Sequence, residues 1–218
     1  SSAVCMSSAT AALELTLRVL GVGPGDEVIT SEYTYTASAS VIYHDGAKIV
    51  LIDTAPDSYE IDYDKLAAAI TEKTKVVIPV DIGGVMVDYD KVFAAVESKK
   101  HLYHPSNDIQ ALFDRPIVMA DAAHSFGASY HGIKSGAIAD FTNFSLLGVK
   151  KTTTYSCWKV VQLQHIVFVH IYLPSISLNN GIKCEKAAYL WSKKFKIFLL
   201  GVNKTTTYSA WQVAQLQY

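Results

Sequence analysis

Short apolar runs alternate along this chain with segments in which apolar residues recur every three or four positions. The first periodic segment starts at Thr10 and places Leu13, Leu17 and Leu20 on one helical face, with Gly21 at the position of a helix C-cap. Further helices are predicted over 35–43, 62–70 and 88–98, and strands over 27–30, 48–52, 75–80 and 117–121. The pattern therefore predicts a chain of alternating strands and helices.

Several of the predicted strands are continuous apolar runs, which is typical of strands buried on both faces. The predicted fold is therefore α/β, a three-layer α/β/α arrangement around a mainly parallel sheet. In such sheets ligands bind beyond the carboxyl ends of the strands. Asp81 and Asp121 lie at such ends, and polar residues around Ser8, Tyr33 and Ser145 lie near others. Asp81 and Tyr33 are expected to line the substrate side of a site assembled from these ends.

Composition narrows the classes of partner. With 19 basic and 20 acidic residues in 218, the chain carries no charge excess that would favour nucleic acid or an anionic membrane. Its N-terminus has no basic region before an apolar segment, so no signal peptide is expected. The apolar stretch 165–173 is about half as long as the roughly 20 residues of a spanning helix, and we interpret it as a buried strand.

The cysteines and histidines do not indicate a metal centre. The three cysteines form no CxxC pair and leave an odd count, which argues against disulfides and zinc and makes the reducing cytoplasm the expected location. His101 and His104 lie in a predicted loop, 99–116, with a short helix in it. Histidines in a polar loop are mostly solvated, so no metal is expected there.

The last third of the sequence contains a near-identical repeat, in which residues 147–164 recur as 200–217. Two copies are too few for a solenoid. The copied unit also begins inside the lysine segment described next. We interpret the repeat as a duplication, a rearrangement or an error in the sequence, and we assign no separate domain to 155–218.

Two segments carry candidate chemistry. An apolar strand delivers Asp121, and a second strand from Asp140 is followed by Ser145 and Lys150. A carboxylate can keep the ring nitrogen of pyridoxal 5'-phosphate (PLP) protonated, and a lysine amine can bind the cofactor as a Schiff base. The alternatives are a strand-end cap for the aspartate and a solvated loop for the lysine. Lys151 competes with its neighbour for the Schiff-base role.

With these motifs the chain resembles the DegT/StrS family of PLP-dependent sugar aminotransferases, of fold type I, from about Ala3 to about Thr154. The resemblance implies a PLP-binding large-domain core over 1–154. It implies cofactor-binding roles for eight residues: Ser8, Ala9 and Thr10 at the phosphate, Tyr35 stacking on the ring, Asp121 at its nitrogen, His124 near its phenolic oxygen, Ser145 at the phosphate and Lys150 as the Schiff-base lysine. Lys150 and Asp121 are the implied catalytic residues. For the first motif an ordinary threonine N-cap remains the alternative, and for Tyr35 a core tyrosine.

The sequence departs from the family pattern in four respects. Ala9 replaces the usual glycine of Ser-Gly-Thr. Tyr155 to Trp158 replace the usual Glu-Gly-Gly, which permits a tight turn under the cofactor. The segment that usually precedes Ala3 and the C-terminal small domain have no counterpart in this sequence.

The resemblance implies transamination between an amino-acid donor and a keto-sugar nucleotide, in a homodimer with sites at the subunit interface. A lysine rather than a histidine at position 150 favours transamination over dehydration. The alternative hypothesis is a truncated or rearranged, non-catalytic relative that keeps the α/β core. A nucleotide-binding Rossmann domain is disfavoured, because Gly21-Val-Gly-Pro-Gly25 precedes a strand instead of opening a helix.

Overall fold

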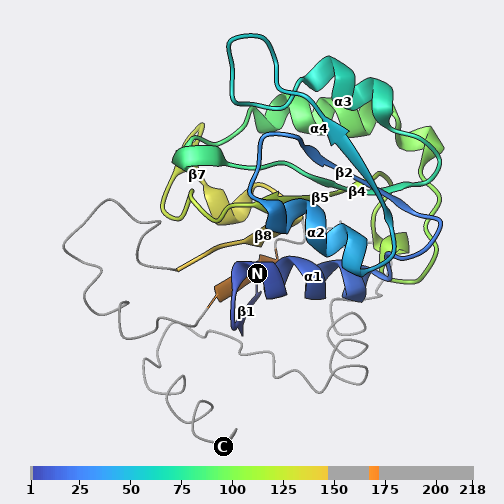
Figure 1. The fold of residues 1–218 in the computed structure, drawn as a ribbon, viewed down its shortest axis with the longest axis horizontal. Coiled ribbons are helices and arrows are strands. Elements are labelled where there is room, and N and C mark those ends of the chain that lie inside the picture. Colours follow the sequence, from blue (N-terminus) through green and yellow to red (C-terminus); the bar gives the residue numbers. More distant parts are fainter. Residues whose placement is uncertain (1, 147–166, 172–218) are drawn as a thin grey trace, which may run out of the picture.

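The computed structural model describes residues 2–146 and 167–171, with side chains from residue 3 to 146 (Figure 1). The strands of its main sheet are β1 (Ser2–Met6), β2 (Glu27–Ser31), β3 (Lys48–Ile52), β4 (Thr74–Ile78), β5 (Ile117–Asp121), β8 (Phe141–Asn143) and β9 (Val167–Ile171). The helices are α1 (Ala9–Leu20), α2 (Thr36–His44), α3 (Tyr63–Ala69) and α4 (Tyr89–Ser98). Short 3₁₀ turns are η1 (Ile82–Gly84), η2 (Lys100–Leu102), η3 (Gln110–Leu112) and η4 (Ser135–Ala137), and β6 (Ser129–Tyr130) pairs with β7 (Ile133–Lys134).

The sheet has the strand order β1-β9-β8-β5-β4-β2-β3. Five neighbouring strands, from β8 to β3, run parallel, while β9 is antiparallel to both β8 and β1. Because β9 is antiparallel to both of its neighbours, these two neighbours, β1 and β8, run parallel to each other. The carboxyl ends of all strands except β9 therefore lie at one edge of the sheet, which confirms the predicted mainly parallel architecture.

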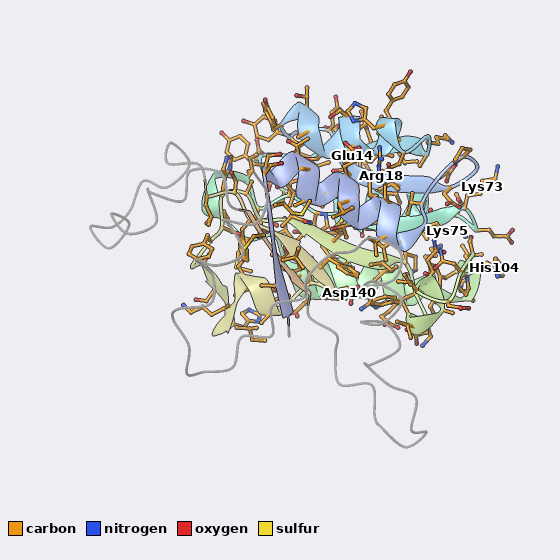
Figure 2. The ribbon with its side chains drawn as sticks, turned by 90° about the horizontal axis from the view of Figure 1, so that it is seen from below. Glu14, Arg18, Lys73, Lys75, His104 and Asp140 are labelled. Carbon is orange, nitrogen blue, oxygen red and sulfur yellow. The ribbon has the colours of Figure 1, made fainter. Side chains whose placement is uncertain are left out.

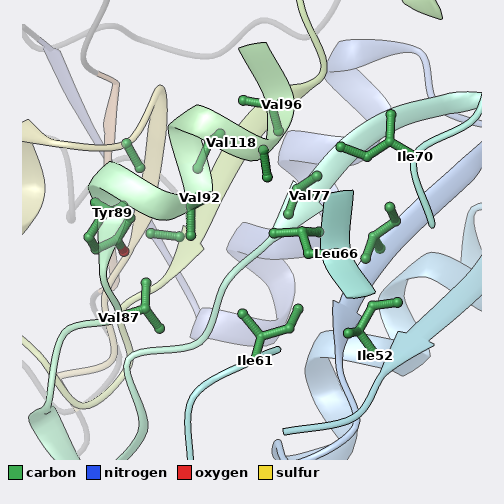
Figure 3. Packing of buried hydrophobic residues seen from close by; sticks show 14 of the residues in the cluster. Ile52, Ile61, Leu66, Ile70, Val77, Val87, Tyr89, Val92, Val96 and Val118 are labelled. Atoms are coloured by element: carbon green, nitrogen blue, oxygen red, sulfur yellow. The ribbon is translucent and has the colours of Figure 1, made fainter. Parts of the chain in front are cut away.

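Helices cover both faces of the sheet (Figure 1). Successive residues of the central strands point to opposite layers. Val76, Ile117 and Met119 pack with α1 and α2, whereas Val77 and Val118 pack with α3 and α4. Figure 3 shows the second layer, in which Leu66 of α3 and Val92 of α4 pack with strand residues in one buried cluster: Ile52, Ile61, Leu66, Ile70, Val77, Val87, Tyr89, Val92, Val96 and Val118. Burial on both faces explains why the strands appear in the sequence as continuous apolar runs.

Polar residues at helix termini define where the helices begin and end. Asp62 and Asp88 accept hydrogen bonds from first-turn amides of α3 and α4, as expected for N-caps. Gly21 ends α1 with φ of 69°, the left-handed conformation that favours glycine. The threonine N-cap considered for α1 is wrong: the cap is Ser8, whose Oγ accepts from the amide of Ala11 at 3.0 Å.

A buried ion pair joins β5 to β8. The guanidinium of Arg115 donates from Nη1 and Nη2 to the two carboxylate oxygens of Asp140, at 2.8 and 3.0 Å. The same carboxylate accepts from the amide of Val118 at 2.8 Å. Figure 2 labels Asp140 and, apart from it, Lys75 and His104, of which the Lys75 ammonium donates to the His104 carbonyl. The polar anchor at Asp140 aligns the starts of the two strands whose other ends carry Asp121 and Ser145.

The strand expected over 165–173 is confirmed as β9, Val167–Ile171, lying between β1 and β8. The repeated segments 147–164 and 200–217 lie outside the described residues, so the division at residue 154 stays a prediction. In residues 2–146 and 167–171, no helix combines the length and apolar character that crossing a membrane requires.

Candidate functional site

Asp121 lies at the carboxyl end of β5, and its side chain is directed toward the α1 and α2 layer. The residue is 6% exposed. Ser38 of α2 donates from Oγ to Asp121 Oδ2 at 2.7 Å, and the amide of Ala123 donates to Oδ1 at 3.2 Å. The flanking Ala122 is fully buried. These contacts fix the orientation of the carboxylate and leave each of its oxygens a further acceptor position.

The start of α1 lies at the same edge of the sheet, because β1 is parallel to β5. Ser8 is extended, with φ of −160°, and caps the helix, while Ala9 and Thr10 form its first turn. Helix geometry provides no intrahelical acceptor for first-turn amides, and the helix dipole adds partial positive charge there. Ala9 adopts helical geometry, so the glycine usual at this position is not needed for the helix to begin here.

β8 supplies a third part of the site. Ser145 follows β8 by two residues and is 6% exposed. Asn143 pairs with Asp121 in parallel register, so their side chains lie on the same face of the sheet. The Nδ2 of Asn143 donates to the Ala120 carbonyl at 3.4 Å, whereas its buried Oδ1 has no hydrogen-bond partner within the described part of the chain. Lys150, the predicted Schiff-base lysine, lies outside the described residues.

Tyr35 occupies the N-cap position of α2 and is 68% exposed. The alternative of a core tyrosine is therefore wrong. The residue follows β2 at the same edge of the sheet as Asp121. Tyr33 is also exposed, and its ring stacks on Tyr59 with centroids 5.3 Å apart.

His124 is half-buried and is held by the loop after β4. The amide of Gly83 donates to Nδ1 at 3.2 Å. Because a backbone N–H can only donate, Nδ1 accepts and the neutral ring carries its proton on Nε2. Gly84 has φ of 86°, and a Cβ there would lie 3.1 Å from the His124 carbonyl oxygen. The absence of a side chain at Gly84 thus allows this loop to pack closely on His124.

Asp81 was expected to line the substrate side, but it is buried, at 1% exposure. Ser125 Oγ donates to its Oδ2 at 2.6 Å, and Tyr89 Oη and the Val87 amide donate to its Oδ1, each at 3.2 Å. Burial, with a smaller contribution from the nearby Asp121, raises the pKa of Asp81 to about 6, although its hydrogen bonds act in the opposite direction. The carboxylate therefore points into the protein, where it binds residues next to the candidate site instead of lining the site itself.

Sequence reasoning missed two residues of this arrangement. Ser38 orients Asp121 from 83 positions away, and Ser125 joins Asp81 to Ser135, with its Oγ 2.8 Å from Ser135 Oγ. A serine on the apolar face of α2 was the available signal for Ser38, since that face otherwise packs on the sheet. The sequence contains no such signal for Ser125, because its contact with Asp81 depends on how the loops after β4 and β5 fold against each other.

The described residues contain no cluster of three or more His, Cys, Asp or Glu side chains that would suit a metal ion. His104 contributes its backbone carbonyl to a hydrogen bond with Lys75.

Comparison with known proteins places this geometry in context. Residues 1–157 match the model of the DegT/DnrJ/EryC1/StrS aminotransferase family. The chain is 38% identical over 157 residues to GDP-perosamine synthase of Caulobacter vibrioides, covering 70% of this chain and 37% of that protein. It is 42% identical over 133 residues to UDP-2-acetamido-2-deoxy-3-oxo-D-glucuronate aminotransferase of Pseudomonas aeruginosa, covering 60% and 33% of the two chains.

Among solved structures, the fold is similar to that of a Streptococcus pneumoniae protein described as a sugar aminotransferase. Its apo-form matches with a TM-score of 0.74 and 44% identity, over 86% of this chain and 44% of that one. Its PLP-form matches with a TM-score of 0.73. The chain thus spans less than half the length of each of these proteins.

Proposed function

This chain belongs to the DegT/DnrJ/EryC1/StrS aminotransferase family, and we propose that it binds PLP and contributes the cofactor-binding core of an aminotransferase. The proposed reaction moves an amino group from an amino-acid donor to a keto-sugar nucleotide. The names of the relatives support the substrate class, since they include aminotransferases of nucleotide sugars. The PLP-form and PMP-form of the similar solved structure support the cofactor.

The observation that carries the proposal is the buried, oriented carboxylate of Asp121. A carboxylate beside the ring nitrogen favours its protonated form, and the buried Asp121 would offer one at the edge where parallel sheets bind ligands. The neighbouring Asn143 Oδ1 is buried without a partner in the described chain, which is the condition of a group that completes its hydrogen bonding with a ligand. The residues present therefore fit PLP.

Each remaining residue would hold one part of the cofactor. Ser8, Ala9 and Thr10 would bind the phosphate through the amides and hydroxyls at the start of α1, with Ser145 approaching from β8. Tyr35 would cover the ring. His124, with its proton on Nε2, would donate toward the phenolic oxygen.

When bound, PLP supplies an electron sink for the bonds at the substrate's Cα. Lys150 would hold the cofactor through its amine, and its Nζ, once released, would accept and return the Cα proton of the amino donor. Asp121 would keep the ring nitrogen protonated throughout. Ser38 would keep Asp121 in the required orientation by donating to Oδ2.

We also propose a homodimer in the cytoplasm. Large apolar side chains are exposed at the carboxyl edge of the sheet, where the candidate site lies: Tyr33, Tyr35, Tyr59, Val85 and Phe126. Exposed apolar residues gathered at one edge are typical of an interaction surface. The cysteine pattern, without paired spacing, supports a reducing location.

The test is to incubate the full chain with PLP, record the visible absorption spectrum, reduce with borohydride and map the labelled peptide. We expect a Schiff-base band with the label on Lys150. Lys150→Ala should abolish the band, Asp121→Asn should weaken it, and Lys151→Ala should leave it intact as the matched control. No band, or label spread over surface lysines, would favour the alternative of a non-catalytic relative that keeps the α/β core.

A further inference from the structure

Asp81 is the centre of a buried hydrogen-bond network behind the candidate site. Its carboxylate accepts from Ser125 after β5 and from Tyr89 and Val87 at the start of α4. Ser125 extends the network to Ser135 in η4, with their hydroxyl oxygens 2.8 Å apart. One side chain thus joins three segments that follow different strands.

This carboxylate is buried without a compensating cation. Within residues 3–146, no lysine, arginine or histidine side chain forms an ion pair with Asp81. Burying an unpaired carboxylate costs free energy that an asparagine of the same shape would avoid. A residue that is unfavourable for stability and lies beside a ligand site is a candidate for a functional role.

The backbone around Asp81 contacts the cofactor-binding segment directly. The amide of Asp81 donates to the Asp121 carbonyl at 3.1 Å, and the amide of Gly83 donates to His124 Nδ1 at 3.2 Å. With the Ser125 hydroxyl on the Asp81 carboxylate, segment 81–84 holds segment 121–125 at three successive points. Displacing Ser125 would therefore move His124.

We propose that ionised Asp81 is a positioning residue for His124: by accepting from Ser125 it fixes segment 121–125 against segment 81–84, and protonation of Asp81 loosens that contact. The inference rests on the proposed function, because the position of His124 matters for a cofactor only if the chain binds PLP.

The change from ionised to protonated Asp81 falls close to neutral pH. Burial brings the pKa of this carboxyl to about 6, so it is mostly ionised above that pH and mostly protonated below it. The titratable groups that act on it are Tyr89 from α4 and Asp121 at the end of β5, while His124 in the following loop contacts the Gly83 amide. Burial raises the pKa of Tyr89 well above its ordinary value, so this phenol stays neutral across the range.

Asp81→Asn reproduces the protonated carboxyl permanently without removing the network. The amide oxygen can still accept from Tyr89 and Val87, while the amide nitrogen donates to Ser125, whose own proton then turns to Ser135. The fold is therefore expected to persist. What is lost is the charge-assisted bond to Ser125, which is about twice as strong as a neutral one.

The test compares the dissociation constants for PLP of the wild-type chain and Asp81→Asn at about pH 8 and about pH 5. Titration of the cofactor and of all other side chains is common to both proteins and cancels in the ratio. We expect Asp81→Asn to bind about tenfold more weakly at the higher pH and equally at the lower one. A ratio that is near unity at both values, or independent of pH, would overturn the proposal.

Two further variants separate positioning from a general loss of structure. Ser125→Ala removes the donor, so it should weaken PLP binding at the higher pH as Asp81→Asn does. Asp108→Asn makes the same chemical change at an exposed carboxylate and should have no effect. An unchanged PLP affinity in Ser125→Ala would contradict the role of Ser125.

A measurement without cofactor distinguishes this inference from the proposed function. Through local openings that break the bond to Ser125 while residue 81 stays buried, amide hydrogen exchange of segment 121–125 in the apo-chain should be about tenfold faster in Asp81→Asn than in wild type at about pH 8, although global unfolding of the variant is less favourable. If wild type binds no PLP while exchange responds in this way, the proposed function fails but the contact between the two segments stands. Exchange that is identical in both proteins would refute the contact itself.

Discussion

Removing the carboxylate of Asp140 should be the most destabilising single polar substitution at the start of β8. Asp140→Ala leaves the guanidinium of Arg115 buried, with Glu97, 3.2 Å from its Nε, as its remaining acidic contact. It also leaves the Val118 amide without its acceptor. Both side chains of the pair are almost inaccessible, at 11% and 3% exposure, so solvent cannot replace the lost bonds.

The magnitude follows from these contacts. Breaking a buried pair by removing one partner costs about 3–5 kcal/mol. For a chain of this size that corresponds to a fall in melting temperature of roughly 10 °C. Urea unfolding followed by circular dichroism measures the free energy directly, and we expect the midpoint to fall while the slope stays the same.

A double substitution identifies the cause. Arg115→Met with Asp140→Asn removes both charges while the asparagine oxygen still accepts from Val118, so it should restore all but about 1–2 kcal/mol. Lys65→Ala removes two exposed ion pairs as a control, and its cost should stay below about 1 kcal/mol. If Asp140→Ala costs no more than that control, or if the double variant is as unstable as the single one, the ion pair does not anchor the strands.

Three other predictions test the site. Ser38→Ala removes the donor to Asp121 and should weaken PLP binding about tenfold, measured by absorption, with little change in urea midpoint. Gly84→Ala places a Cβ 3.1 Å from a carbonyl at φ of 86° and should cost about 2–3 kcal/mol, whereas Gly83→Ala, with open space, should cost about 1; equal losses would exclude the contact as the cause. Folding raises the Asp81 pKa from 3.8 to about 6, so the stabilisation from its protonated form is complete below about pH 4 and lost as pH rises through about 6. Urea unfolding at several pH values should show Asp81→Asn gaining stability relative to wild type across that window, and a constant difference would contradict the shifted pKa.

Much of the fold could be predicted from local sequence. Strand Ile117–Asp121 is a continuous apolar run ending in a carboxylate, and it is β5 at the predicted bounds. Asp62 and Asp88 precede their helices and cap them. These features succeed because they depend on neighbours a few residues apart.

The rest depends on pairs that are distant in the chain. Ser38 orients Asp121 through a hydrogen bond that spans 83 positions of the chain. Ser125 binds the buried carboxylate of Asp81 across 44 positions. The sequence placed Asp81 at a strand end correctly but gave no indication of which way its side chain points. The side chain points toward its donors Ser125, Tyr89 and Val87, and two of these donors are side chains that come from other elements.

The position of β9 affects how far this chain could be shortened. Residues 1–157 match the family, yet β1 is joined to the rest of the sheet through Val167–Ile171, which pairs with β1 on one side and β8 on the other. A truncation at the end of the family match would deprive β1 of its only neighbour among the described strands and leave a bare row of backbone donors and acceptors along β8. The start of α1 follows directly after β1 in the chain, whereas Asp121 belongs to β5, one of the five parallel strands. The five residues of β9, which lie beyond the family match, therefore connect β1 to the parallel strands that carry Asp121.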